Sequence, residues 1–178
     1  MRYAALLRAV NLPSHQKVGM AALRICLEKA GLTDVRTLLQ SGNAVFDAPG
    51  EPDTVARAIE RAIAGRFGME VGVVVRTAAE WADVVAADAL GDVATGGAKQ
   101  HVIFLSAPPD AAALAAIGDP APEAFAVRGR EIHVWCPDGL QGSALFKALS
   151  KPQIAPGAIA TARNWNTVTK LAALAGEG

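Results

Sequence analysis

The chain has 178 residues, of which 52% are hydrophobic and 19% charged, a composition typical of soluble globular proteins that excludes a disordered chain. Its 17 basic residues balance its 17 acidic residues, so attraction of the whole molecule to nucleic acid or to an anionic membrane is not supported. The longest uncharged stretch, residues 152–162, is far shorter than the roughly 20 apolar residues of a membrane span, so we expect no membrane segment.

The first 76 residues predict the element order β-α-β-β-α-β. Leu23 and Leu27 recur with helical spacing, as do Ile59 and Ile63, and a glycine follows each of these two patterns. Residues 40–43 contain the Gly and Asn that favour a tight turn between two strands. The expected elements are strands at residues 2–10, 35–39, 44–48 and 71–76, a helix from Met20 to Ala30, and a helix capped by Asp53 that ends before Gly68.

A similar order recurs after a connecting helix. Thr77 and Glu80 have the spacing of a capping box, in which each side chain bonds to the backbone N–H of the other residue, so we expect that helix to begin there. A glycine-containing loop follows at residues 91–98. The elements expected beyond it are strands at 101–105, 124–128, 131–135 and 158–161, helices at 110–117 and 143–149, and a last helix capped by Asn164.

This order is that of the ferredoxin-like fold, in which two helices cover one face of an antiparallel sheet. We therefore predict an α+β protein with two ferredoxin-like (βαββαβ-type) halves and a C-terminal helix. The first half spans residues 1–88, and the second spans residues 99–178 and includes the last helix. Residues 89–98 form the connecting loop.

The sequence contains no motif for a metal site, a phosphate loop or a nucleophile. The histidines at 15, 101 and 133 and the two cysteines, Cys26 and Cys136, lack the spacing of metal ligands, so we predict no metal site. We expect His101 and His133 to be hydrogen-bonded structural residues in strands, and Cys26 to be buried and inert. The cysteine count favours the reducing cytoplasm. The sequence assigns no catalytic residue, cofactor or oligomeric state.

Nucleic-acid binding by this fold would need aromatic side chains on the middle strands of the sheet, where bases stack. Tyr3 and Phe46 would make only a thin stacking surface, and we expect them to pack in the core or at the sheet edge. RNA recognition is therefore not supported.

The charges are unevenly distributed along the chain. Residues 1–27 contain four basic residues and no acidic one, and residues 139–178 carry a net charge of +3. Residues 28–138 carry the compensating −7. If the two ends come together, they would form an electropositive face; the alternative is that these charges scatter over the surface.

Three polar clusters occur where apolar or simple loop residues would suffice. The first follows the first strand, the second occupies the turn, and the third begins the last helix, where backbone N–H groups and an arginine attract anions. Each cluster also has a structural interpretation, because the same residue types pair with carboxylates, close turns or cap helices. The candidate ligand-binding residues are Arg8, Asn11, Gln40, Ser41, Asn43, Arg163, Asn164 and Thr167.

The three segments that contain these residues, at 6–11, 40–43 and 163–171, resemble the signature segments of a bacterial family known as domain of unknown function 1697. The resemblance implies a two-part α+β fold with ferredoxin-like character and implies no known reaction. The family usually has Gly where Ala9 stands and a glycine pair near residues 13–14, so the first loop of this chain is stiffer.

Two functional hypotheses follow. The first is a protein that binds a small anionic ligand, bearing phosphate or carboxylate, between the end of the first strand and the start of the last helix. The alternative is a non-catalytic structural or protein-interaction domain whose polar motifs only stabilise the fold. Internal hydrogen bonds that consume every motif side chain would favour the alternative.

Overall fold

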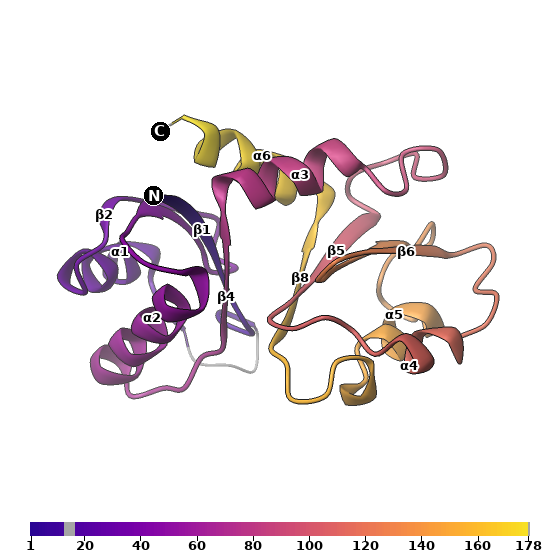
Figure 1. The fold of residues 1–178 in the computed structure, drawn as a ribbon, viewed down its shortest axis with the longest axis horizontal. Helices are drawn as coiled ribbons and strands as arrows, with labels where there is room; N and C mark the ends of the chain where they lie inside the picture. The colour runs from indigo at the N-terminus through magenta and orange to yellow at the C-terminus, as the bar shows by residue number, and fades with distance from the viewer. Residues whose placement is uncertain (13–16, 178) are drawn as a thin grey trace. The chain divides into compact units, whose positions relative to one another are not determined.

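The computed structural model describes residues 1–12 and 17–177, which form two compact units. The first unit comprises Met1–Asp83 and Lys170–Gly178, and the second comprises Val84–Thr169. Figure 1 shows that each unit is built on its own sheet. The family difference expected at residues 13–14, and His15, lie outside the described residues. The predicted boundaries at residues 88 and 99 stay a prediction.

The first unit contains a four-stranded antiparallel sheet of order β2-β3-β1-β4. Tyr3, Phe46 and Val75 project from one face of this sheet and pack with Leu23 and Ile59 of the helices in one hydrophobic core. The sheet and its two helices confirm the first predicted ferredoxin-like half. The elements are β1 Arg2–Leu7, α1 Met20–Lys29, β2 Thr33–Leu38, β3 Asn43–Asp47, α2 Pro52–Phe67 and β4 Val73–Thr77.

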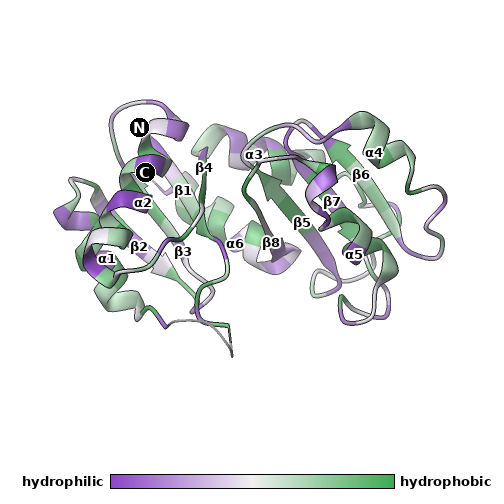
Figure 2. Cartoon of the chain, turned by 90° about the horizontal axis from the view of Figure 1, so that it is seen from below, coloured by the Kyte–Doolittle hydropathy of each residue, from purple (hydrophilic) through white to green (hydrophobic). Residues whose placement is uncertain are grey.

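The second unit repeats this topology with strand order β6-β7-β5-β8. Ile103, Ile132 and Val134 project from one face and form a core with Leu145 and Leu149 of α5. Figure 2 shows the apolar character of β5, β6 and β8. The elements are β5 Gln100–Leu105, α4 Ala111–Ala115, β6 Ala124–Arg128, β7 Glu131–Trp135, α5 Ala144–Leu149, the 3-10 turn η1 Pro152–Ile154 and β8 Ala160–Asn164.

Two further helices, α3 (Ala78–Ala87) and α6 (Trp165–Gly176), each contribute residues to both units. The capping box before α3 is present, because Thr77 N donates to Glu80 Oε2 at 2.8 Å and Glu80 N donates to Thr77 Oγ1 at 3.1 Å. The predicted cap of α6 is also present. Within the described residues, no helix has the length and apolar character needed to cross a bilayer.

The structure differs from the local predictions in several places. The strand expected to reach Val10 ends at Leu7, because Ala9 and Asn11 adopt left-handed backbone conformations with φ of 55° and 57°. Asp53 lies inside the first turn of α2, whose N-cap is Glu51, since proline at the first helical position needs no backbone partner. The turn η1 was not expected from the sequence.

The predicted burial of the two aromatic residues and of Cys26 is confirmed. Tyr3 and Phe46 are fully buried and their ring centroids lie 6.0 Å apart in the core of the first unit. Cys26 and Cys136 are buried free thiols, and burial raises the pKa of each. Such thiols are poor nucleophiles because little thiolate is present at neutral pH.

Candidate functional site

The first two predicted polar clusters lie together in the first unit. Residues 8–12 follow β1, and residues 39–43 form the connection from β2 into β3; we call these two segments the loop pair. Asn11 Nδ2 donates to the carbonyl of Gln40 at 2.6 Å and joins one loop to the other. The backbone ties the second loop to the end of β1, because Leu7 N donates to Gly42 O at 2.8 Å.

The asparagines of the loop pair are engaged in internal hydrogen bonds. Asn11 Nδ2 also donates to Val18 O at 2.8 Å, and Asn11 Oδ1 accepts from Val18 N at 2.7 Å. Asn43 is fully buried, and its Nδ2 donates to Leu38 O at 2.7 Å and to Ser41 Oγ at 2.9 Å. Both asparagine side chains therefore hold the loop pair in shape.

Gly42 is required by this close packing. Its φ is +80°, a conformation that side chains disfavour. A Cβ at this position would overlap Val10 Cγ2 and lie 2.9 Å from Leu7 Cβ, closer than Cβ atoms approach other atoms in proteins. The predicted turn is thus also a packing contact with the end of β1.

Arg8 and Gln40 are the motif residues of the loop pair whose side chains remain available. Both are exposed, and neither side chain forms a hydrogen bond or ion pair with residues 1–12 or 17–177. Leu39, which directly precedes Gln40, is 50% exposed, and Leu12, at the end of the Arg8 segment, is 46% exposed. Leu39 also has a positive φ of 58°. Non-glycine residues in this conformation are uncommon and cluster at functional sites.

The third predicted cluster lies in the second unit, at the end of β8 and the start of α6. Arg163 is 8% exposed, and its Nη1 donates to Thr161 Oγ1 and to Ala162 O, each at 2.8 Å. Burial lowers the pKa of Arg163 to about 10, so its guanidinium stays charged at neutral pH. Arg163 is thus a largely enclosed cation with bonds inside its own strand.

Two backbone amides of the first turn of α6 have partners inside the second unit. Asn164 Oδ1 accepts from Thr167 N at 2.9 Å, and Trp165 N donates to Gly97 O at 3.1 Å. A Cβ on Gly97 would overlap Asn166 Oδ1, so a side chain at this position would displace the Asn166 amide. These bonds leave fewer amides for an anion than the sequence alone suggests.

The structure shows a buried histidine, His133, whose surroundings could not be predicted from the sequence. His133 in β7 is fully buried, and neither of its ring nitrogens has a hydrogen-bond partner among the described residues. The expectation of a hydrogen-bonded histidine is therefore wrong for this residue. Its ring lies 5.9 Å from the Trp165 ring. Burial lowers the pKa of His133 to about 4, an effect that Asp88 opposes and Arg128 reinforces.

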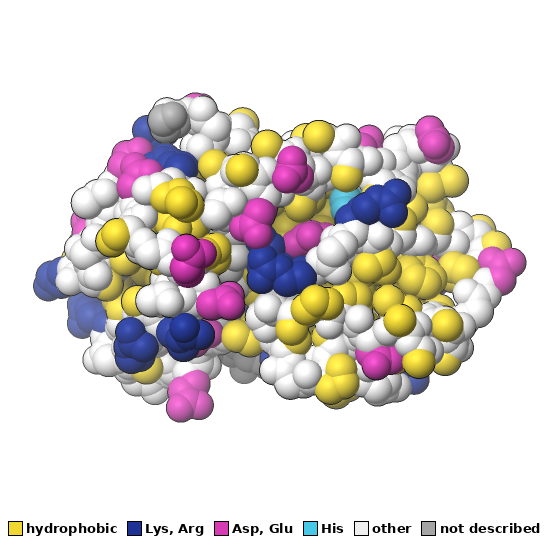
Figure 3. Space-filling model, viewed as in Figure 1, with side chains coloured by type: hydrophobic (Ala, Val, Ile, Leu, Met, Phe, Trp, Pro, Cys, Tyr) yellow, Lys and Arg dark blue, Asp and Glu magenta, His cyan; other side chains and the backbone are white. Residues whose placement is uncertain are grey.

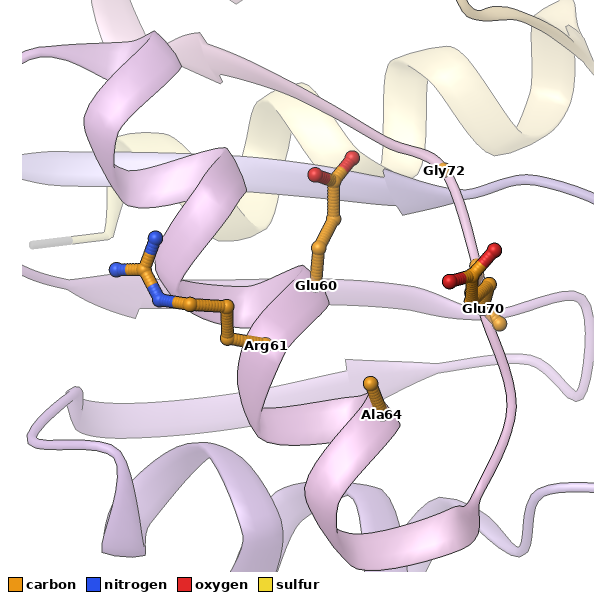
Figure 4. A pocket seen from close by; sticks show the side chains of 6 residues that line it. Glu60, Arg61, Ala64, Glu70 and Gly72 are labelled. Carbon is orange, nitrogen blue, oxygen red and sulfur yellow. The ribbon is translucent and has the colours of Figure 1, made fainter.

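A shallow hollow of about 370 Å³ lies in the first unit between α2 and the segment before β4. Figure 4 shows Glu60 and Ala64 rising from the helix, with Glu70 across from them and Arg61 extending away from Glu70. Glu60 Oε1 already accepts from Val73 N at 2.9 Å. Two carboxylates in the lining make this hollow unsuitable for an anion.

Within the described part of the chain, no group of three His, Cys, Asp or Glu residues could hold a metal ion.

The charges near the chain ends are partly paired within the first unit. Arg2 Nη1 lies 2.7 Å from Asp34 Oδ2 and 3.3 Å from Asp47 Oδ2. Arg36 Nη1 lies 2.8 Å from Glu177 Oε2. Figure 3 shows basic and acidic side chains interspersed on the face that it displays. The charge of Arg2 is thus neutralised locally, whereas the exposed Arg8 has no such partner in the described residues.

Comparison with known proteins identifies the family and the fold. Residues 1–133 match the model of the family described as protein of unknown function (DUF1697), and the chain belongs to this family. The segment with Arg163 lies beyond the matched residues. The chain is similar in structure to a conserved bacterial protein, SP0830, from Streptococcus pneumoniae, with a TM-score of 0.75 and 21% identity over 98% of each chain. No curated protein matches it.

Proposed function

We propose that this DUF1697 protein binds a small anion that carries a phosphate or carboxylate group. The observation that supports the proposal best is the exposed guanidinium of Arg8, which has no hydrogen-bond or ion-pair partner among the described residues. An arginine can bind both oxygens of a phosphate or carboxylate through two parallel N–H bonds. Holding such a group on an ordered loop reduces the entropy lost when a ligand binds.

The surroundings of Arg8 favour a negative ligand. Residues 1–27 contain no acidic residue, and Lys17 in the same region is exposed. Gln40 is exposed in the loop that Asn11 ties to the Arg8 loop, and its amide supplies both a donor and an acceptor. The proposed contact residues of the first unit are therefore Arg8 and Gln40, with Ser41 beside them in sequence, and Asn11 and Asn43 are proposed to hold these residues in position.

Arg163, Asn164 and Thr167 are the candidate contact residues of the second unit. Their present bonds are internal, and Arg163 and Thr167 are 8% and 6% exposed, so they would contribute mainly through the enclosed positive charge. A charge in such surroundings is screened less by salt than an exposed one. The cytoplasm is the proposed location, because both cysteines are free thiols.

The proposal is tested by thermal unfolding of the wild type, Arg8→Ala, Gln40→Ala and Arg163→Ala in the presence of inorganic phosphate, nucleotides, sugar phosphates and small carboxylates. A ligand at about 100 times its dissociation constant stabilises the folded protein by about 2.7 kcal/mol, which is a shift of several degrees. We expect one ligand class to shift the wild type and Arg8→Ala to lose that shift. Arg57→Ala is the matched control, because Arg57 is an exposed arginine on α2 of the same unit.

If no ligand class shifts the wild type, or if Arg8→Ala and Arg57→Ala respond alike, the anion proposal fails. A shift by oligonucleotides that falls steeply with added salt would instead indicate nucleic-acid binding, in which released counterions dominate the affinity.

The second candidate function is a non-catalytic structural or protein-interaction domain. The internal hydrogen bonds of Asn11, Asn43 and Asn164 favour it, because these motif side chains stabilise loops and a helix start without any ligand. Under this alternative, Arg163→Ala lowers the melting temperature strongly and no anion changes it.

A further inference from the structure

The edge strand β2 of the first sheet is protected against pairing with another strand. Its register shifts between Thr33 and Arg36, and Asp34 there has a positive φ of 44°. Arg2 Nη1 donates to the Asp34 carbonyl, and Arg36 pairs with Glu177 at 2.8 Å. Irregular register, charged side chains and covering groups are the devices by which proteins prevent edge-to-edge association.

The edge strand β6 of the second sheet has a regular register, and its charged residue is Arg128 at its last position. Its sequence is Ala-Phe-Ala-Val-Arg, and its register with β7 is regular from Ala124 to Arg128. Apart from the β6–β7 ladder, the bond that the described residues make to its backbone is from Arg128 Nη1 to the Val127 carbonyl at 3.2 Å. Within the described residues, the open side of β6 is therefore a row of backbone donors and acceptors in which the Val127 carbonyl accepts from the exposed Arg128.

The hairpin geometry shows which groups form this row. Arg128 lies opposite Glu131, so Gly129 and Arg130 make a two-residue turn. The pair that closes such a hairpin exchanges hydrogen bonds, and bonded pairs alternate along an antiparallel ladder. The N–H and C=O groups of Phe125 and Val127 therefore point to the open side, in agreement with the bond from Arg128 to the Val127 carbonyl.

We propose that β6 pairs antiparallel with β6 of a second copy of this chain, with Ala126 at the two-fold axis. This register uses the whole strand and places Phe125 opposite the partner's Val127. It also places each Arg128 opposite the small Ala124 of the partner subunit, with the two guanidinium groups at opposite ends of the ladder. Parallel pairing would set the two arginines side by side, where their charges repel.

The apolar face of β6 supports a second copy as the occupant. Phe125 and Val127 are partly buried and pack against the core of the second unit, together with Ile117 and Phe146. Pairing Phe125 with the partner's Val127 continues this apolar layer into the second copy. Hydrophobic atoms gather over β6, α4 and α5 on the face shown in Figure 3. A second copy shields part of this surface as well as the backbone row.

The register is tested by disulfide trapping of Ala126→Cys and Ala124→Cys in the full chain. Residues opposite each other in a non-bonded antiparallel pair have Cα atoms about 4.5 Å apart, within the range of a disulfide. The proposed register makes Ala126 such a pair with itself and separates the two copies of Ala124 by about 13 Å. Both alanines are half-buried on the same face of β6, and the native Cys26 and Cys136 are buried.

We expect mild oxidation to give at least about tenfold more covalent dimer with Ala126→Cys than with Ala124→Cys on a non-reducing gel. Equal trapping of the two variants, or none in either, overturns the proposal. Circular dichroism of both variants shows that each is folded before trapping is compared.

A second measurement needs no cross-link. The mass of the wild type by sedimentation equilibrium should rise from micromolar to millimolar concentration, while Ala126→Lys and Ala126→Glu should each stay monomeric because like charges meet at the axis. An equimolar mixture of these two variants should associate again. A wild type that stays monomeric throughout overturns the proposal, as does a mixture that does not associate.

Discussion

Substitution of Gly42 by alanine should destabilise the first unit strongly. The backbone at Gly42 has φ of +80°, and an L-residue in the left-handed region costs about 1–2 kcal/mol. The added Cβ would also overlap Val10 Cγ2 and lie 2.9 Å from Leu7 Cβ, and overpacking of this kind costs about 1–3 kcal/mol. We therefore expect a loss of about 3 kcal/mol in the free energy of unfolding.

The matched control is Gly50→Ala. Gly50 has φ of +94°, and a Cβ there would meet no atom within 4 Å, so only the backbone cost of about 1 kcal/mol applies. In thermal unfolding of a chain of this length, each kcal/mol is about 2–4 °C, so Gly42→Ala should melt about 6–12 °C below the wild type. If the two variants lower the melting temperature equally, the contact of Gly42 with Leu7 and Val10 does not contribute to stability.

Two other perturbations test the core and the buried histidine. Ile59→Ala should lower the free energy of unfolding by about 2–5 kcal/mol in a urea titration, because Ile59 is fully buried in the core of the first unit. The control Ile25→Ala, at a site that is 45% exposed, should lower it by less than about 0.5 kcal/mol. The folded state holds His133 neutral with a pKa of about 4, and the unfolded chain takes up this proton near the ordinary value of 6.5, so stability should fall as the pH drops from about 6.5 to about 4. The loss due to His133 is about 3 kcal/mol. Urea titrations at pH 7 and pH 4.5 measure how much stability each protein loses between these two pH values. A His133→Leu variant that loses as much as the wild type would contradict this assignment.

Most of the fold follows from local patterns in the sequence. The strand β6 begins and ends at the predicted residues, because Gly129 sets the adjoining turn. Gly68 ends α2 in the left-handed conformation, as its position after an apolar helical face predicts. The early end of β1 could not be read from hydropathy, since Val10 is itself buried after the chain has turned at Ala9.

The chemical character of the candidate site was less predictable. Sequence patterns select Asn11, Asn43 and Asn164 because asparagine is used in turns and caps, and the structure shows each of them bonded in that way. Whether an arginine is exposed, like Arg8, or enclosed, like Arg163, depends on tertiary packing that local spacing does not encode. The same is true of His133. The alternation of residues along β7 predicts on which face of the sheet it lies, but it does not predict that its ring nitrogens have no hydrogen-bond partner among the described residues.

Some motif residues hold the loops in place and others are available to contact a ligand, and this difference decides which variants can reveal ligand binding. Replacing Asn11 removes three internal hydrogen bonds, so it would loosen the loop pair whether or not a ligand binds there. Replacing Arg8 removes a side chain with no bond or ion pair to the described residues, so the folded protein should keep its stability within about 0.5 kcal/mol. A ligand shift that disappears in Arg8→Ala at unchanged melting temperature would therefore report binding, whereas the same result in Asn11→Ala would be ambiguous.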